Sequence, residues 1–177
     1  MIYICTVITP LGEMIARAEN NSLTGLWFND QKYCPLDTEE WIYNPDHDVF
    51  KTLRSWLDDY FSGIFRNHDI RIDLHGTEFQ KKVWDIIIKI PFGETVTYGE
   101  IAECLESGKN ITENISENKK SARYARAVGG ATGKNPVAIL VPCHRVMGAD
   151  GKLTGYAAGT ERKKALLELE KDRKCSI

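Results

Sequence analysis

The hydrophobic pattern of this 177-residue chain changes its period near His75 and Gly76. Before that point, several short segments alternate apolar and polar residues, which is typical of β-strands, and one stretch over 48–64 has helical spacing. After it, apolar residues recur at every third or fourth position, which is typical of helices. The change predicts two domains: an α/β domain over residues 1–75 and a mostly helical domain over residues 76–177.

Three short strands are expected at the start of the chain, over residues 2–8, 13–18 and 23–28. The turn sequences Pro10-Leu11-Gly12 and Asn20-Asn21-Ser22 separate them, so the economical arrangement is an antiparallel meander. A loop over 34–47, an amphipathic helix over 48–64 and a short strand over 70–74 complete the first domain.

Capping sequences mark the helices of the second domain. Thr77–Gln80 and Thr97–Glu100 each place a Thr three residues before a Gln or Glu, which is the capping-box pattern. Two further helices are expected over residues 122–131 and 160–174, the latter capped by Thr160, and residues 106–121 form a polar loop. The helices on either side of that loop predict a helix-turn-helix, although the loop is longer than the usual turn.

A candidate nucleophile lies in the pentapeptide Pro142-Cys143-His144-Arg145-Val146. The pentapeptide closes an apolar run over residues 137–141, so a buried strand or other hydrophobic segment ends on a thiol. A thiol beside basic groups suggests nucleophilic chemistry, and a buried structural cysteine is the alternative. Neighbouring side chains point in different directions, so His144 would act on Cys143 through a water and would need a carboxylate to orient it.

Glu170 is the candidate for that carboxylate. Lys163, Leu166, Leu167 and Glu170 recur at helical spacing and therefore share one stripe of the last helix. Because Leu166 must pack inward, Glu170 lies on or near the buried face, where a carboxylate needs a partner. The alternative is a solvated glutamate in a charged tail.

The composition bounds the class of protein. Five widely spaced cysteines without a Cys-x-x-Cys pair fit neither a disulfide framework nor a zinc finger, and favour reduced thiols in the cytosol. No apolar run approaches the roughly 20 residues of a membrane span, and no signal peptide is visible. Residues 1–75 contain 6 Lys and Arg against 12 Asp and Glu, whereas residues 76–177 contain 17 against 13. The second domain is therefore the one suited to a polyanion.

Taken together, the motifs of the second domain closely resemble those of the O6-alkylguanine-DNA alkyltransferases, also called methylated-DNA–protein-cysteine methyltransferases. Their order and spacing agree from residue 76 to about residue 171, apart from the 106–121 loop. The matching segments include Gly76-Thr77-Glu78-Phe79-Gln80, Ile90-Pro91-Phe92-Gly93-Glu94-Thr95, Thr97-Tyr98, Ala125-Arg126-Ala127-Val128-Gly129-Gly130-Ala131, Asn135-Pro136, Pro142-Cys143-His144-Arg145-Val146 and Gly155-Tyr156. The resemblance implies a ribonuclease-H-like N-terminal domain and a C-terminal domain with a winged-helix-like helix-turn-helix.

The resemblance also implies a reaction. Cys143 would accept a methyl or larger alkyl group from O6-alkylguanine in DNA, with O4-alkylthymine as a further candidate substrate. His144 would be the base, acting through a water and oriented by Glu170. Asn135 would hold the turn beside the active site, and Tyr98 would donate a hydrogen bond to the leaving base. Lys163 matches a lysine near the site, and Arg145 matches a motif residue with a structural role.

The family's way of binding DNA extends the prediction to one helix of the second domain. Arg126 would fill the space left by a flipped nucleotide, because the O6 atom cannot be reached inside the base stack. The small side chains of Ala125, Ala127 and Gly129 would let this helix approach the minor groove. Tyr156 and the backbone at Val146 and Met147 would line the base pocket.

The expected partner is double-stranded DNA carrying O6-alkylguanine, and the protein is expected to be a cytoplasmic monomer that does not bind membranes. No cofactor is expected, because the damaged DNA supplies the alkyl group. A carbon–sulfur bond to that group has no easy hydrolytic exit, so each molecule would act once. Some family members bind zinc in the N-terminal domain, but Glu19 and Thr24 accompany Cys5 and His75 here, so no metal site is expected.

Three features depart from the family pattern. The 106–121 loop is longer than the usual connection, and its Lys109, Lys119 and Lys120 either contact phosphate or belong to a tolerated insertion. Tyr124 stands where a small residue is common, and Ala157 stands where Ser is frequent.

Other classes of protein are weaker explanations of these residues. An alkyltransferase-like lesion sensor would flip the base without repairing it, but such proteins lack the acceptor that Cys143 provides. A helix-turn-helix regulator would leave Cys143, His144 and Glu170 without a function. A thiol protease is disfavoured, because the remaining histidines lie in loop or boundary positions: His47, His68 and His75.

Overall fold

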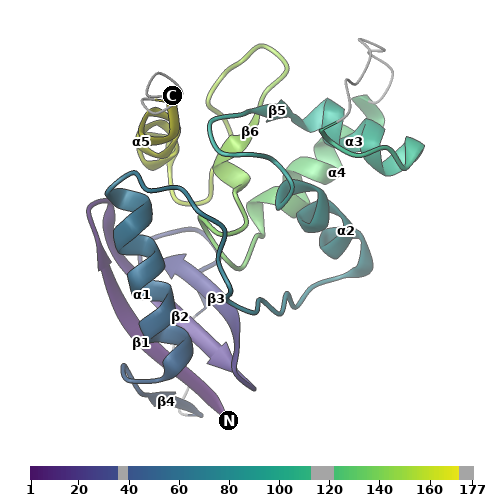
Figure 1. Ribbon diagram of the computed structural model, residues 1–177. Coiled ribbons are helices and arrows are strands. Elements are labelled where there is room, and N and C mark those ends of the chain that lie inside the picture. The colour runs from purple at the N-terminus through teal and green to yellow at the C-terminus, as the bar shows by residue number, and fades with distance from the viewer. Residues whose placement is uncertain (36–39, 113–121, 172–177) are drawn as a thin grey trace. The chain divides into compact units, whose positions relative to one another are not determined.

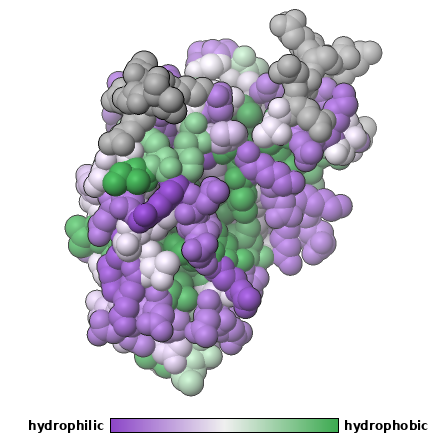
Figure 2. Space-filling model, in the orientation of Figure 1, coloured by the Kyte–Doolittle hydropathy of each residue, from purple (hydrophilic) through white to green (hydrophobic). Residues whose placement is uncertain are grey.

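A computed structural model describes residues 1–35, 40–112 and 122–171 of the chain (Figure 1). These residues form two compact units. The first contains Met1–His75 together with Pro136–Ala138, and the second contains the remainder from Gly76 onward. Within the described ranges, no helix is both long enough and apolar enough to cross a membrane. Figure 2 shows hydrophilic side chains over most of the visible face, with hydrophobic ones between them.

The first unit is built on a four-stranded sheet with the order β3-β2-β1-β4. Strands β1 (Ile2–Thr9), β2 (Gly12–Glu19) and β3 (Ser22–Phe28) form the expected antiparallel meander. Strand β4 (Trp41–Tyr43) pairs in parallel with β1, so the prediction of a continuous loop over 34–47 was wrong at these residues. Three residues are too few to establish an alternating pattern, so pairing with β1 determines this strand.

Helix α1 (Asp48–Phe61) lies against one face of the sheet (Figure 1). It ends before the predicted residue 64, because the chain reverses through Ser62 and Gly63, whose φ is 73°. Its apolar stripe is buried, as the spacing predicted: Phe50, Leu53, Trp56, Leu57 and Tyr60. The predicted strand over 70–74 is reduced to one bridge between Ile72 and Leu23.

The second unit is mostly helical. Its helices are α2 (Glu78–Ile87), α3 (Tyr98–Ser107), α4 (Ala122–Gly133) and α5 (Thr160–Lys171), and β5 (Val96–Thr97) pairs with β6 (Val146–Met147). Both predicted capping boxes are present at α2 and α3. Helix α4 packs against both α2 and α3. The indole Nε1 of Trp84 on α2 donates to the Ala131 carbonyl of α4 at 2.9 Å.

The apolar run over residues 137–141 is buried but is not a strand. Val137 makes a single bridge to Leu26 of β3, and the chain then turns. Ile139 has a φ of 70°, a left-handed conformation that is unusual for a β-branched residue. The run therefore leads into a 3-10 turn, η1 (Cys143–Arg145), and is not the end of a β-strand.

Two other expectations concern the ends of helices. Helix α5 includes Thr160 as its first residue, and the Lys163 N–H bonds to the Gly159 carbonyl at 3.2 Å, so Thr160 is not the cap. Residues 113–121 of the expected loop, with Lys119 and Lys120, lie outside the described residues, as do residues 172–177.

Candidate active site

The 3-10 turn η1 directs three neighbouring side chains to different partners. Successive residues of such a turn are rotated by about a third of a circle, so Cys143, His144 and Arg145 cannot share one direction. The Arg145 N–H closes the turn on the Pro142 carbonyl at 2.9 Å. All three residues are buried: Cys143 is 6% exposed, His144 0% and Arg145 4%. The predicted absence of a direct thiol–imidazole contact follows from this geometry.

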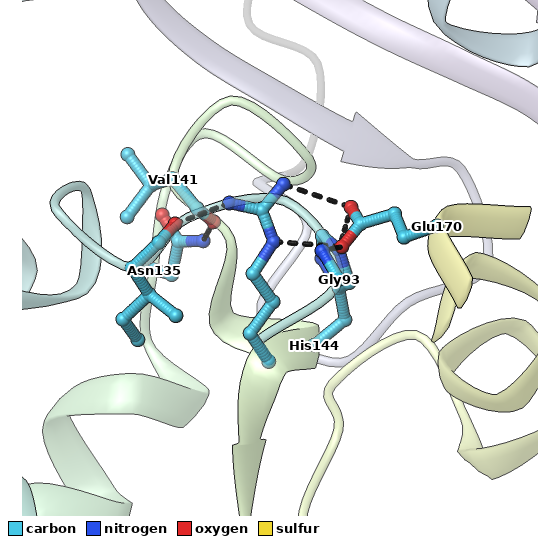
Figure 3. A network of polar contacts seen from close by, with 7 residues as sticks. Gly93, Asn135, Val141, His144 and Glu170 are labelled. Carbon is cyan, nitrogen blue, oxygen red and sulfur yellow. Dashed lines mark hydrogen bonds and ion pairs between the residues drawn. The ribbon is translucent and has the colours of Figure 1, made fainter. Parts of the chain in front are cut away.

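Asn135 contacts the thiol. Its Nδ2 donates to Cys143 Sγ at 3.0 Å and to the Val141 carbonyl at 2.8 Å, so it links the buried turn to the sulfur. Figure 3 shows Asn135 beside Val141. Burial raises the pKa of the Cys143 thiol, and the Asn135 amide and the Lys163 ammonium oppose that rise. The sulfur is therefore a thiol that needs a base before it can act as a nucleophile.

His144 bonds to Glu170 of α5, and Figure 3 shows the carboxylate reaching from that helix toward the imidazole. The Nε2 to Oε1 distance is 2.8 Å, and Nε2 carries the proton because an ionised carboxylate only accepts. Nδ1 is buried and has no hydrogen-bond partner among the described residues. Burial lowers the pKa of His144 despite the opposing effect of Glu170, so the ring is neutral and Nδ1 is basic.

Glu170 accepts four hydrogen bonds, two on each oxygen. Besides His144, Oε1 accepts from Arg145 Nη2 at 2.8 Å, while Oε2 accepts from Arg145 Nε at 2.9 Å and from the Gly93 N–H at 3.1 Å. Burial alone would raise the pKa of this carboxyl, but the donors of His144 and Arg145 outweigh it and hold the pKa well below its usual range. Glu170 is therefore a buried carboxylate with its acceptor capacity filled.

Lys163 supports the opposite side of the site. Its buried ammonium donates to the Val146 carbonyl at 2.5 Å and to the Thr154 carbonyl at 2.8 Å. Desolvation lowers the pKa of Lys163 to about 8, and the nearby Cys143 partly opposes this shift. The Val146 carbonyl, expected to line a base pocket, is thus engaged by this lysine.

Two tyrosines flank the sulfur. Tyr98 donates to the Thr154 carbonyl at 3.3 Å, the same acceptor that Lys163 uses. Tyr156 is buried and its hydroxyl has no partner among the described residues. Burial raises the pKa of both phenols, and a charge on Cys143 raises it further.

The predicted DNA-binding residues lie on α4. Arg126 and Ala127 are exposed, Ala125 is half-buried, and Tyr124 is 41% exposed instead of packed inward. Gly129 adjoins one of the catalytic candidates, since a Cβ built on it would lie 3.9 Å from the Tyr98 ring. The structure thus brings together the residues around Cys143 and leaves Arg126 at the surface.

Sequence reasoning missed the contribution of the segment that precedes β5. The Ile90 carbonyl accepts from Arg145 Nη1, the Phe92 ring lies 4.4 Å from the Arg145 guanidinium carbon, and Gly93 donates to Glu170. The motif over residues 90–95 was matched without a role for any of its residues, and Pro91-Phe92-Gly93 by itself indicates only the end of a helix. Thr154 was missed for the same reason, because backbone groups carry no residue-type signature.

The first unit offers no cluster suited to a metal. Among the described residues, no group of three His, Cys, Asp or Glu side chains could hold an ion. Cys5 instead faces Arg54, whose Nη1 lies 3.9 Å from Sγ, and burial raises the pKa of this thiol to about 11.

Comparison with known proteins first defines a class: a ribonuclease-like domain followed by a helical DNA-binding domain. A family model described as the DNA-binding domain of 6-O-methylguanine DNA methyltransferase matches residues 78–172. The model of the ribonuclease-like domain of the same family matches residues 2–74. The chain belongs to the 6-O-methylguanine DNA methyltransferase family.

Individual relatives match over nearly the whole chain. The methylated-DNA–protein-cysteine methyltransferase of Mycobacterium tuberculosis is 43% identical over 173 residues, covering 98% of this chain and 94% of the relative. That of Methanosarcina acetivorans is 40% identical, covering 96% and 98%. The crystal structure of the M. tuberculosis O6-methylguanine methyltransferase gives a TM-score of 0.80 at 42% identity, covering 98% and 94%. The M. tuberculosis protein in complex with DNA gives 0.80 at 41% identity, covering 97% and 94%.

Proposed function

We propose that the protein repairs double-stranded DNA by moving the alkyl group of O6-alkylguanine onto Cys143 Sγ. The observation that carries the proposal is a buried thiol bonded to Asn135, next to a histidine whose Nε2 donates to Glu170. The Nδ1 of this histidine has no hydrogen-bond partner in the part of the chain that the structure describes. Membership of the family and the solved DNA complex of the M. tuberculosis relative support DNA as the partner. O4-alkylthymine is a second candidate substrate by the same chemistry, since its alkyl carbon is also bonded to an exocyclic oxygen of the base.

The transfer is a displacement at the alkyl carbon. His144 Nδ1 takes the thiol proton through a bridging water, and Sγ attacks the carbon. The carbon–oxygen bond breaks, and its electron pair remains on the guanine. Tyr98 leaves the Thr154 carbonyl and donates to the base as negative charge develops there. Glu170 stays ionised and stabilises the imidazolium that forms.

Each molecule acts once. The product is a thioether on Cys143, and its alkyl group is a poor target for water because the thiolate would be the leaving group. The protein is thus consumed by the reaction that it promotes.

DNA is read by α3 and α4, which we assign as a helix-turn-helix, with β5 and β6 as the small sheet of a winged-helix-like domain. The exposed Arg126 enters the stack where the damaged nucleotide is flipped out, which offsets part of the lost stacking. The small Ala127 beside it allows close approach to the groove. All proposed catalytic groups come from one chain, so a monomer suffices, and the need for a reduced thiol favours the cytoplasm.

Intact-protein mass spectrometry after incubation with duplex DNA containing O6-methylguanine tests the transfer. We expect a gain of one methyl group in place of hydrogen, mapped to Cys143 and absent in Cys143→Ala. Cys34→Ala is the matched control, because it removes a half-buried thiol of the first unit and should transfer normally. DNA binding without transfer under reducing conditions would instead favour a lesion sensor.

The flipping step has its own test. Arg126→Ala should transfer slowly from duplex DNA but at a nearly normal rate from a free O6-alkylguanine base, which needs no extrusion. Lys82→Ala on α2 removes another exposed cation and serves as the control. If Arg126→Ala slows transfer equally from duplex DNA and from the free base, Arg126 has no role in flipping the nucleotide.

A further inference from the structure

The turn between α2 and β5 is more elaborate than a helix stop requires. Helix α2 ends at Ile87, and a separate turn follows, closed by the Glu94 N–H on the Pro91 carbonyl at 3.2 Å. Gly93 is its third residue and has a φ of 73°, the position where a type II turn needs glycine. The turn explains the glycine, but it requires neither an aromatic residue at position 92 nor an amide aimed at α5.

Three neighbouring groups of this segment contact the Arg145–Glu170 pair. The Ile90 carbonyl accepts from Arg145 Nη1, the Phe92 ring covers the guanidinium at 4.4 Å, and the Gly93 N–H donates to Glu170 Oε2 at 3.1 Å. Arg145 and Glu170 are buried, with exposures of 4% and 2%, while Phe92 is half-buried. The turn therefore separates this ion pair from water on one side.

The orientation of Glu170 depends on this contact. Each of its oxygens accepts two hydrogen bonds, and the Gly93 amide is one of the two on Oε2. Without it, Oε2 would lose a donor that Oε1 does not share, and the carboxylate would be held less firmly in its present orientation. Among the described residues, the side chain of His144 bonds to Glu170 Oε1 alone, so rotation of Glu170 would also release the imidazole.

We propose that Phe92 and Gly93 are positioning residues for the transfer reaction, which fix the Glu170–Arg145 pair and thereby aim His144 Nδ1 at the thiol proton. The inference rests on the proposed function, since it assigns an effect on alkyl transfer. Phe92 acts by covering the guanidinium with a π face and excluding water. Gly93 acts through its amide, which its left-handed backbone presents to Oε2.

Single-turnover transfer from duplex O6-methylguanine DNA, measured from pH 5 to 8, tests the role. Phe92→Leu keeps an apolar side chain but loses the π face, and we expect the rate at pH 7 to fall about tenfold, the lower end of losses seen when supporting residues of metal sites are changed. Phe92→Tyr keeps the face and should restore the rate. Pro91→Ala changes the exposed first residue of the same turn and is the control.

The pH profile separates positioning from a general loss of structure. The charged groups around His144 are Glu170 and Lys163 from α5 and Arg145 from its own turn, and burial holds the imidazole neutral among them. Water admitted by Phe92→Leu weakens that burial, so the acid limb of the profile should move to higher pH. Gly93→Ala should move it in the same direction. If Gly93→Ala does not fold, the comparison of Phe92→Leu with Phe92→Tyr still tests the positioning role.

The outcomes distinguish the two proposals. A wild-type protein that transfers no methyl group to Cys143 would refute the proposed function itself. If the wild type transfers and Phe92→Leu shows an unchanged rate, the positioning role is wrong. A slower Phe92→Leu with an unshifted acid limb, or one that Phe92→Tyr fails to rescue, also overturns it.

Discussion

Arg145→Met should destabilise the protein far more than the loss of an ordinary surface charge. The guanidinium donates two charge-assisted hydrogen bonds to Glu170, at 2.8 and 2.9 Å, and a third to the Ile90 carbonyl. Both charged partners are buried, so the variant leaves an ionised carboxylate without its cation. Removing one partner of a buried pair costs about 3–5 kcal/mol. Because whole domains are stable by about 5–15 kcal/mol, this is a large fraction of the total.

The double variant Arg145→Met/Glu170→Met provides the internal comparison. It removes both charges and replaces them with apolar side chains of similar length, so no uncompensated charge is buried. Its remaining cost is the loss of partners for three groups, the His144 Nε2–H, the Gly93 N–H and the Ile90 carbonyl, at about 1–3 kcal/mol for each group left unsatisfied in a buried site. The effects of the two changes should therefore be strongly non-additive, with the second costing much less in the background of the first. Transfer activity should be lost in both variants.

Urea unfolding measures these free energies. The four tryptophans give a fluorescence signal, and coincidence with far-ultraviolet ellipticity checks that the transition is two-state. Lys164→Met is the matched control, because its ammonium lies 3.9 Å from Glu168 with both side chains exposed, and it should cost less than about 0.5 kcal/mol. The buried pair does not hold the site together if Arg145→Met lowers the unfolding free energy by less than about 1 kcal/mol. The same conclusion follows if the losses of unfolding free energy from the changes at Arg145 and Glu170 simply add.

Three further predictions concern the base, the sulfur and the sheet. The pKa of His144 is depressed below its ordinary 6.5, so the imidazole stays neutral at that pH and single-turnover transfer should fall only in more acidic buffer; a rate already halved at pH 6.5 would contradict this. Asn135→Ala removes the amide donor of Cys143 Sγ and one of the two donors of the Val141 carbonyl, which keeps the Cys143 N–H at 2.8 Å. At about 0.5–1.5 kcal/mol for each of the two hydrogen bonds lost, it should lower the urea unfolding free energy by about 1–3 kcal/mol and slow transfer, and an unchanged rate would show that the amide has no role at Sγ. Gly25→Ala puts a Cβ 1.8 Å from the Trp27 ring and should lower thermal stability by about 1–3 kcal/mol without slowing transfer.

Local signals in the sequence predicted the helices well. Both capping boxes were confirmed, because the Thr and the Gln or Glu satisfy backbone groups within four residues of each other. The meander was also confirmed, since each turn joins strands that pair directly. The run over 137–141 could not be assigned in the same way. Its five apolar residues fit any buried segment, and only contacts with Leu26 and the left-handed φ of Ile139 make it a turn.

For the candidate site too, the sequence predicted contacts that depend on helical spacing but not those made by the backbone. The stripe of α5 placed Glu170 on a buried face, and its contact with His144 is present at 2.8 Å, although its catalytic role stays a prediction. The Gly93 amide was invisible, because every residue type except proline carries such a donor. Nor did the motif reveal that Arg145 and His144 share one carboxylate, since that depends on the three directions of a 3-10 turn.

The charges of the proposed site are arranged for an intermediate state of the reaction more than for the resting protein. At rest, burial raises the pKa of Cys143 and lowers that of His144, so both groups are neutral. When the proton moves from sulfur to imidazole, a thiolate and an imidazolium form inside the same cluster. In the proposed reaction, Asn135 and Lys163 would then stabilise the thiolate, and Glu170, already ionised and fixed by Arg145, would stabilise the imidazolium. Stabilisation that appears only along the reaction path accelerates transfer, while a neutral buried thiol resists solvent oxidants and stray electrophiles until a base is bound.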